Sequence, residues 1–221
     1  QHEAFSMLDD IDATGGMILN GHIVAIRGLG GVHLACDATN AAAVAELRRR
    51  KGRAGKAFAL MARDLGVVRE YCEVSEVEAA ALSGPEAPIV LLKSLPNSLP
   101  DSIAPGLDRL GVMLPYTPFY HMILRRIGRP VVMTSGNPSG QPQCITNADT
   151  RERLADIADF ACLHDREIAN RIDDSVVRVD LSRPRLLRRA RGYAPAGLPL
   201  PLGFSRDVQV LAMGSEVKNT F

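Results

Sequence analysis

The sequence of 221 residues lacks the features of several protein classes. No apolar run approaches the ~20 residues that a membrane span needs, and the acidic beginning QHEAFSMLDDID is unlike a signal peptide. Twenty-six Lys and Arg against 25 Asp and Glu leave a net charge of +1, and aromatic residues make up only 5%. These values argue against a broad nucleic-acid-binding surface. We therefore expect a soluble, cytoplasmic globular protein without membrane contact, in which any affinity for anions is local.

Cysteine is also scarce, with one residue each at positions 36, 72, 144 and 162. No C-x-x-C pair and no histidine cluster is present, so we expect reduced core thiols and no protein-held metal. Cys36 alone has suggestive neighbours, because His33 and Asp37 lie close by in VHLACDA. A Cys/His hydrolase therefore stays a minor alternative.

Lysine occurs only four times against 22 arginines, and two of the four lie in the stretch LRRRKGRAGKAFALMARDL, residues 47–65. Seven cations and no acid stand between Glu46 and Asp64. The helix dipole can account for the arginines at 48–50, at the end of a predicted helix. Lys51, Arg53 and Lys56 form a K-x-R-x-x-K set around the loop that begins at Gly52. This set is suited to wrapping an anion, although a solvated surface loop is the alternative.

Apolar patterning and capping signals predict an alternating α/β protein. Two helices are well delimited: one has Asn40 as its N-cap and Gly52 after its end, and the other begins at Thr117 and Pro118 and ends at Gly128. Further strands and helices are expected at 21–31, 56–62, 64–72, 75–84, 88–93, 109–115, 130–135, 148–158, 159–165, 174–180 and 185–193.

Two polar segments follow or precede predicted strands. MTSGNPSG, residues 133–140, places Thr134, Ser135 and Asn137 with free backbone N–H groups at the carboxyl edge of a sheet, where α/β proteins commonly bind ligands. A polar turn that only caps a helix is the alternative. GRAGKAF lacks the spacing of a P-loop, and in GLGGVH His33 replaces the last glycine of a dinucleotide fingerprint.

The third constellation is RIDDSVVRV followed by RLLRRARGY. Asp173, Asp174 and Ser175 precede a strand, and its hairpin partner carries Arg188, Arg189 and Arg191. Strand alternation predicts that Arg189 and Arg191 face one side and Arg188 the other. Salt bridging between the acidic pair and the arginines is as probable an interpretation as ligand binding.

Six segments taken together in this order resemble the YrdC-like domain of the hydrogenase-maturation carbamoyltransferases, the HypF family. The resemblance covers about residues 10–205 and rests on RGLGGVHLACDA, RKGRAGKAFALMARD, LGVMLPYTPFYHMIL, PVVMTSGNPSGQP, RIDDSVVRV and LLRRARGYAP. It implies an α/β fold with a twisted mixed sheet, flanking helices and a concave basic cavity. Residues 1–205 are then the YrdC-like domain, and residues 206–221 a linker and the truncated start of the next, transferase domain.

The resemblance also implies an activity. Such domains bind ATP, with Mg²⁺, and carbamoyl phosphate or carbamate, make carbamoyl adenylate and release pyrophosphate. The adjoining domain passes the carbamoyl group to the C-terminal cysteine of a partner protein, where it becomes a cyanide ligand of nickel–iron hydrogenase. This fragment is not expected to complete the transfer by itself.

Site residues are carried over motif by motif. Lys51, Arg53 and Lys56 match the family's basic motif for carbamate and phosphate, and Thr134, Ser135 and Asn137 match its T-S-G-N motif. Ser175 and Arg188 fall where the wider superfamily contacts nucleotide; further candidates are Arg191, Asp174, His33 and Arg27.

Two departures from the family pattern are visible. Ala57 replaces a common proline, and Arg27 replaces a lysine. Alternative functions are a threonylcarbamoyl-adenylate synthase of transfer RNA modification and an RNA-binding module.

Overall fold

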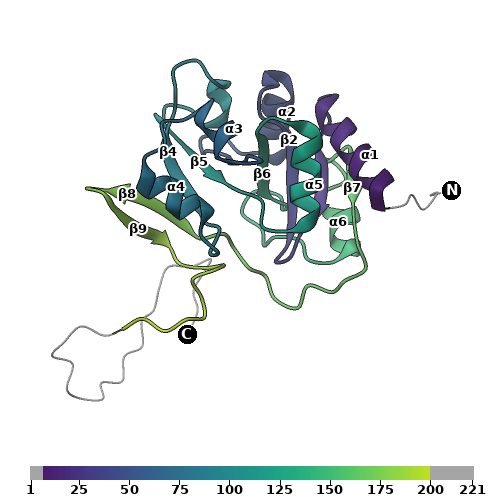
Figure 1. Ribbon diagram of the computed structural model, residues 1–221. Helices are drawn as coiled ribbons and strands as arrows, with labels where there is room; N and C mark the ends of the chain where they lie inside the picture. Colours follow the sequence, from purple (N-terminus) through teal and green to yellow (C-terminus); the bar gives the residue numbers. More distant parts are fainter. Residues whose placement is uncertain (1–6, 200–221) are drawn as a thin grey trace.

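The computed structural model describes residues 7–199, with side chains from residue 10 onward. Nine strands and six α-helices are found in this part of the chain (Figure 1). The expected start of a further domain at 206–221 lies outside the described residues. The strands are β1 (Val24–Arg27), β2 (Val32–Asp37), β3 (Ala59–Met61), β4 (Ile89–Lys93), β5 (Arg109–Met113), β6 (Val131–Ser135), β7 (Phe160–Cys162), β8 (Val176–Asp180) and β9 (Arg183–Arg188). The helices are α1 (Met7–Leu19), α2 (Ala41–Lys51), α3 (Leu65–Arg69), α4 (Glu76–Ser83), α5 (Pro118–Ile127), α6 (Asn147–Arg153) and the 3₁₀ helix η1 (Asp101–Ile103).

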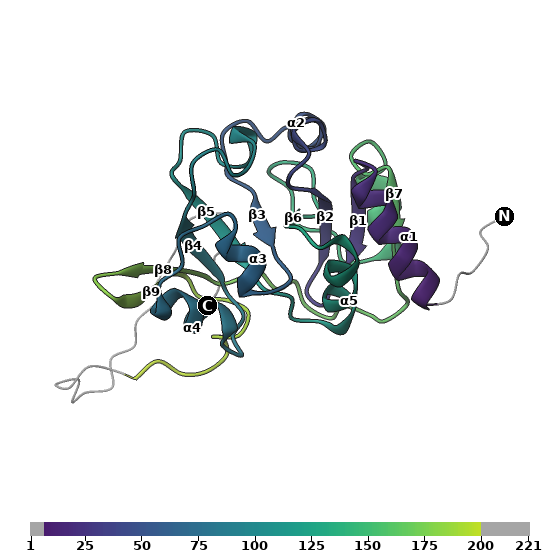
Figure 2. The same ribbon diagram turned by 45° about the horizontal axis from the view of Figure 1, so that its top comes forward.

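All nine strands form one sheet in the order β7-β1-β2-β6-β3-β5-β4-β8-β9. The pairs β1–β7, β3–β5 and β4–β8 are parallel, and the other pairs are antiparallel. The sheet is therefore mixed, and its strands rotate progressively across the molecule (Figures 1 and 2). The prediction of a twisted mixed sheet with flanking helices is confirmed.

The helices cover the sheet with two hydrophobic clusters. α1 and α5 pack beside each other over one face, where Ile26, Ala35 and Met133 are buried. α2 covers the other face through Val44 and Leu47. Since β2 and β6 are interior strands of the sheet, the chain segments at their ends are held by well-packed strands.

The predicted helix boundaries of α2 and α5 are confirmed. Asn40 caps α2 by accepting from the N–H groups of the second and third helical residues, and Gly52 ends it in the left-handed conformation with φ 63°. Thr117 caps α5, and Gly128 ends it with φ 69°. α1 was not predicted from the sequence, because two adjacent glycines inside it weaken the helical signal.

The hairpin of β8 and β9 turns at Leu181 and Ser182, whose φ angles of 49° and 60° suit a tight two-residue turn. β9 ends at Arg188, and Arg191 instead forms an isolated parallel bridge with Asp174. The prediction that Arg189 and Arg191 share one strand face is therefore wrong, because the strand stops before either residue. In the part of the chain that the structure describes, none of the helices has both the length and the apolar character for crossing a membrane.

Candidate anion-binding site

The T-S-G-N segment at the end of β6 lies against the glycine-rich hairpin between β1 and β2. β2 and β6 are antiparallel, with His33 opposite Ser135. The N–H of Gly136 donates to the Val32 carbonyl at 2.6 Å. A Cβ added to Gly136 would lie 2.7 Å from that oxygen, so a larger residue would push the two segments apart. The T-S-G-N motif and the glycine-rich motif before β2 thus meet where β6 ends and β2 begins.

Lys51, from the basic motif, also contacts the end of β6. It is the last residue of α2 and is 3% exposed. Its Nζ donates to the carbonyl oxygens of Ser135 at 2.5 Å and Asn137 at 2.6 Å, and to Asn137 Oδ1 at 3.1 Å. Burial, followed by the nearby charge of Arg53, lowers the pKa of Lys51 from 10.5 to about 8. The basic and T-S-G-N motifs are therefore in direct contact through Lys51.

The side chains of the T-S-G-N segment hold their own loop together. Ser135 Oγ donates to Asn137 Oδ1 at 2.6 Å, and Asn137 Nδ2 donates to the carbonyls of Pro138 at 2.9 Å and Gln141 at 2.6 Å. Thr134 is 6% exposed within β6. The loop is thus shaped before any ligand arrives, which reduces the entropic cost of binding one.

Residues 52–57, which we call the basic loop, are organised by Arg48. The Arg48 guanidinium stacks on the ring of Phe58 with 4.5 Å between Cζ and the ring centre. It donates to five backbone carbonyl oxygens, those of Arg53, Ala54, Lys56, Ser102 and Ile103. The helix dipole therefore does not explain Arg48, because its side chain is bonded to the basic loop and to η1.

The other two predicted cations of this motif differ in exposure. Arg53 is half-buried; its Nε donates to the Lys56 carbonyl at 3.1 Å and its Nη2 to the Ala57 carbonyl at 2.7 Å. Burial, and then the charge of Arg48, lowers its pKa. Lys56 is exposed, and its ammonium forms no ion pair or hydrogen bond with the described residues. Of Lys51, Arg53 and Lys56, it is Lys56 whose charged group is exposed and available to a ligand.

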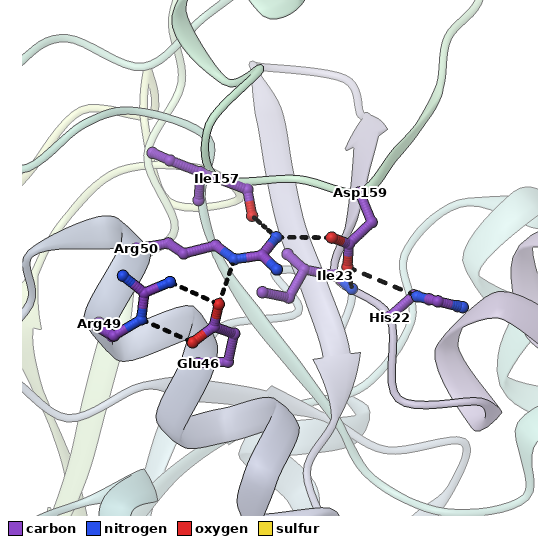
Figure 3. A network of polar contacts seen from close by, with 7 residues as sticks. All are labelled: His22, Ile23, Glu46, Arg49, Arg50, Ile157 and Asp159. Carbon is purple, nitrogen blue, oxygen red and sulfur yellow. Dashed lines mark hydrogen bonds and ion pairs between the residues drawn. The ribbon is translucent and has the colours of Figure 1, made fainter.

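Arg49 and Arg50, on the same helical turn, are neutralised by carboxylates (Figure 3). Both donate to Glu46 at 2.7 to 2.8 Å, and Arg50 also donates to Asp159 at 2.6 Å. The hydrogen bonds from these arginines lower the pKa of Glu46 to about 2. Ion pairing therefore accounts for two of the three arginines that the helix dipole was expected to explain.

A second polar cluster surrounds Asp174. Arg191 Nη2 donates to Asp174 Oδ1 at 2.9 Å and its guanidinium stacks 3.6 Å above the Tyr116 ring. His33 Nε2 lies 3.9 Å from Asp174 Oδ2, and His33 Nδ1 is hydrogen-bonded to Tyr120 Oη at 2.8 Å. Burial would raise the pKa of Asp174, but His33 and Arg191 lower it to about 2. The salt-bridge interpretation is thus correct for Asp174 and Arg191.

Three further candidates are bonded to other elements. Ser175 is fully buried; its Oγ accepts from the Ala190 N–H and donates to the Arg191 carbonyl, both at 2.8 Å. Arg27 Nη1 donates at 2.7 Å to Asn147 Oδ1 and to the carbonyl of residue 164, while its buried Nε has no partner among the described residues. Arg188 lies on the exposed strand β9, opposite Val176. None of the three contacts the basic loop.

The hydrolase alternative is contradicted by the surroundings of Cys36. This residue is fully buried, and burial, followed by the charge of Asp37, raises the pKa of its thiol to about 12. Positions 33 and 36 of one strand point to opposite faces of the sheet. Cys36 therefore has neither the thiolate character nor the neighbouring base that a nucleophile needs.

A hollow of about 560 Å³ is lined in part by the ends of two of the segments that carry the resemblance, at Arg63 and Asp64 and at Leu114, Pro115 and His121. None of the predicted site residues lines it, so the concave basic cavity stays a prediction. The residues that line the hollow are Arg63, Asp64, Leu65, Gly66, Leu82, Ser83, Gly84, Ala87, Leu114, Pro115 and His121.

Sequence reasoning missed Arg48, Tyr116 and Tyr120. The two tyrosines stand four residues apart in YTPFY around the first turn of α5, a spacing that places them on one side of a helix start. That spacing could have identified the two tyrosines as neighbours in the fold. The residue type does not distinguish Arg48 from Arg49 and Arg50, and two of its five carbonyl partners, Ser102 and Ile103, are distant in sequence.

Comparisons with known proteins agree with this architecture. Residues 16–190 match the family Sua5_yciO_yrdC, described as telomere recombination. The chain is 53% identical over 210 residues to carbamoyltransferase HypF of Rhodobacter capsulatus, an alignment that covers 95% of this chain and 28% of that protein. Threonylcarbamoyl-AMP synthase of Vibrio cholerae is 23% identical over 67% of this chain and 82% of its own length.

Among solved structures, full-length HypF in the phosphate- and nucleotide-bound form matches with a TM-score of 0.82 and 49% sequence identity. The match covers 84% of this chain and 30% of that one. The chain thus spans less than a third of the HypF proteins to which it is similar. With its family match over most of its length and this nine-stranded fold, the chain belongs to the Sua5/YciO/YrdC family.

Proposed function

We propose that this chain makes carbamoyl adenylate from ATP and carbamoyl phosphate or carbamate. One observation carries the proposal: Arg48, Lys51 and Arg53 are buried or half-buried, and among the described residues they donate to carbonyl and amide oxygens and never to carboxylates. Positive charge withdrawn from water without a counter-ion costs free energy, which an anionic ligand offsets. The phosphates of ATP would supply that negative charge.

The chemistry requires such a site. Where carbamoyl phosphate is the donor, water first hydrolyses it to carbamate and free phosphate. A carbamate oxygen then attacks the α-phosphorus of ATP, forming a carbamoyl O–P bond while the bond to pyrophosphate breaks. Two anions must approach each other, and charge grows on the departing pyrophosphate, so fixed cations lower the barrier. Lys56 is exposed for phosphate contact, and Lys51, on the other side of Gly52, contacts the segment of Ser135 and Asn137. Mg²⁺, expected with ATP, would be held by phosphate oxygens, and no protein side chain is assigned to it.

The likeness to HypF, known in a phosphate- and nucleotide-bound form, supports nucleotide as the ligand. In a longer protein of the HypF kind, the carbamoyl group would pass to the C-terminal cysteine of a hydrogenase-maturation protein. A threonylcarbamoyl-adenylate synthase is the second candidate, favoured by the relative that this chain matches over 82% of that protein's length. An RNA-binding module is disfavoured by the balanced charge.

The test is ATP–pyrophosphate exchange. We expect exchange that depends on carbamoyl phosphate or carbamate, is lost in Lys51→Ala and Asn137→Ala, and persists in the control Arg49→Ala. Exchange that requires threonine with bicarbonate and ignores carbamoyl phosphate would establish the second candidate. Full activity in both site variants would refute the site.

A further inference from the structure

The carbonyl groups of the basic loop point inward, onto Arg48. Its Nη1 lies 2.6 Å from the Arg53 oxygen and 3.2 Å from the Ala54 oxygen. In a trans peptide the C=O and the following N–H point in opposite directions. The consecutive N–H groups of Ala54 and Gly55 therefore point away from Arg48, and no backbone carbonyl of the described residues accepts from either.

Arg48 is enclosed by these contacts. Its guanidinium is held between the loop carbonyls, the Ser102 carbonyl at 2.6 and 2.9 Å, and the ring of Phe58, which is 1% exposed. All three of its nitrogens are engaged, so the side chain has no free donor with which to contact a ligand. Its planar fork can bind several carbonyls at fixed angles, which a lysine cannot do.

We propose that Arg48 is a positioning residue, and that the Ala54 and Gly55 N–H groups together with Lys56 bind one phosphate group. The proposal rests on the proposed function for the identity of the natural ligand, but the phosphate contact itself does not depend on which acyl group is activated. Backbone N–H groups that face solvent without an internal acceptor can donate to phosphate oxygens, and the Lys56 ammonium is available beside them in the chain. Arg48 and Arg53, which are bonded to carbonyls of the same loop, add positive charge.

The experiment is a titration of the ¹⁵N-labelled chain with inorganic pyrophosphate, followed through backbone amide resonances. In the unmodified chain we expect the Ala54 and Gly55 signals to move in a saturable manner. Arg48→Lys keeps the charge but loses the fork, so it should weaken pyrophosphate binding about tenfold. Arg48→Met should weaken it further, and the matched control Arg49→Met should leave it unchanged.

Two results would overturn the proposal: unmoved Ala54 and Gly55 signals in the unmodified chain, or Arg48→Lys binding as tightly as wild type. The first needs no variant, so it decides the matter even if Arg48→Met fails to fold. Thermal melting of Arg48→Lys and Arg49→Met identifies any general loss of stability. Amide shifts in a chain without any ATP–pyrophosphate exchange would refute the proposed function and leave this inference standing.

Discussion

Two groups of cations at the end of α2 have opposite surroundings. Arg49 and Arg50 meet Glu46 and Asp159, and their charges are balanced within the protein (Figure 3). Arg48 and Lys51, together with Arg53 of the basic loop, donate to carbonyl and amide oxygens among the described residues and to no carboxylate. One continuous basic run thus divides into an ion-paired part and a part that retains its positive charge, and the second part is the one beside the T-S-G-N loop.

The largest expected effect is that of Lys51→Met. This change removes three hydrogen bonds that hold the loop at Ser135 and Asn137, together with a buried charge. We expect ATP affinity to fall about 100-fold, since hydrogen bonds to charged groups are the strong ones. Calorimetric titration with ATP measures it. Arg49→Met should change the affinity less than twofold, and an equal loss in both variants would erase the difference between the two groups.

In the Asp174–Arg191 pair, unlike in either group at the end of α2, a largely buried cation is neutralised by a largely buried carboxylate. Replacing Arg191 by Met takes from Asp174, at 17% side-chain exposure, the guanidinium that donates to it at 2.9 Å. We expect the free energy of unfolding to fall by about 2 kcal/mol. Urea denaturation measures this loss. Asp174→Asn should preserve more stability than Arg191→Met, because it leaves no unpaired carboxylate behind; the reverse order would contradict this account of the cluster.

The lowered pKa of Lys51 predicts a pH effect on stability. Folded Lys51 releases its proton near pH 8, whereas the unfolded side chain does so near its ordinary value of 10.5. Between these values the unfolded state binds more protons, so the stability of the wild type should rise with pH relative to Lys51→Met. The gain is about 1 kcal/mol per pH unit in this window. Paired urea titrations at pH 7.5 and 9.5 measure it, and a constant difference would show that the pKa of Lys51 is ordinary.

The smallest effect is expected for Arg50→Met. Its ion pairs with Glu46 and Asp159 lie near the surface, with the arginine side chain 24% exposed. Such pairs contribute little, and we expect a loss of about 0.5 kcal/mol in the free energy of unfolding, reduced further by salt. ATP affinity should stay unchanged. A strong loss of ATP affinity would place Arg50 in the same group as Lys51.

Capping residues in the sequence predicted where two helices begin and end, because a cap depends on neighbouring residues alone. Asn40, Gly52, Thr117 and Gly128 delimit their helices because caps act within a few residues. The contacts of Arg48 with Ser102 and Ile103 could not be predicted in this way, because these two partners lie in a distant 3₁₀ helix.

For the candidate site, the sequence identified the correct motifs but not how they meet. Lys51, Ser135 and Asn137 were all chosen, yet their direct contact depends on α2 ending beside β6, which is a property of the folded sheet. Arg189 and Arg191 were placed on one strand face because alternation cannot show where a strand stops. Ser175 and Arg27 were chosen by resemblance, and their bonds go to other elements.

The most direct measurement is ATP binding after a carboxylate is added to the basic loop. Ala54→Glu places an acid among cations that have none, and Ala45→Glu places the same acid on the exposed surface of α2, one turn before the paired Arg49. If uncompensated charge attracts the phosphates, Ala54→Glu lowers ATP affinity more than about tenfold and Ala45→Glu leaves it unchanged. Equal affinities in the two variants would contradict the account.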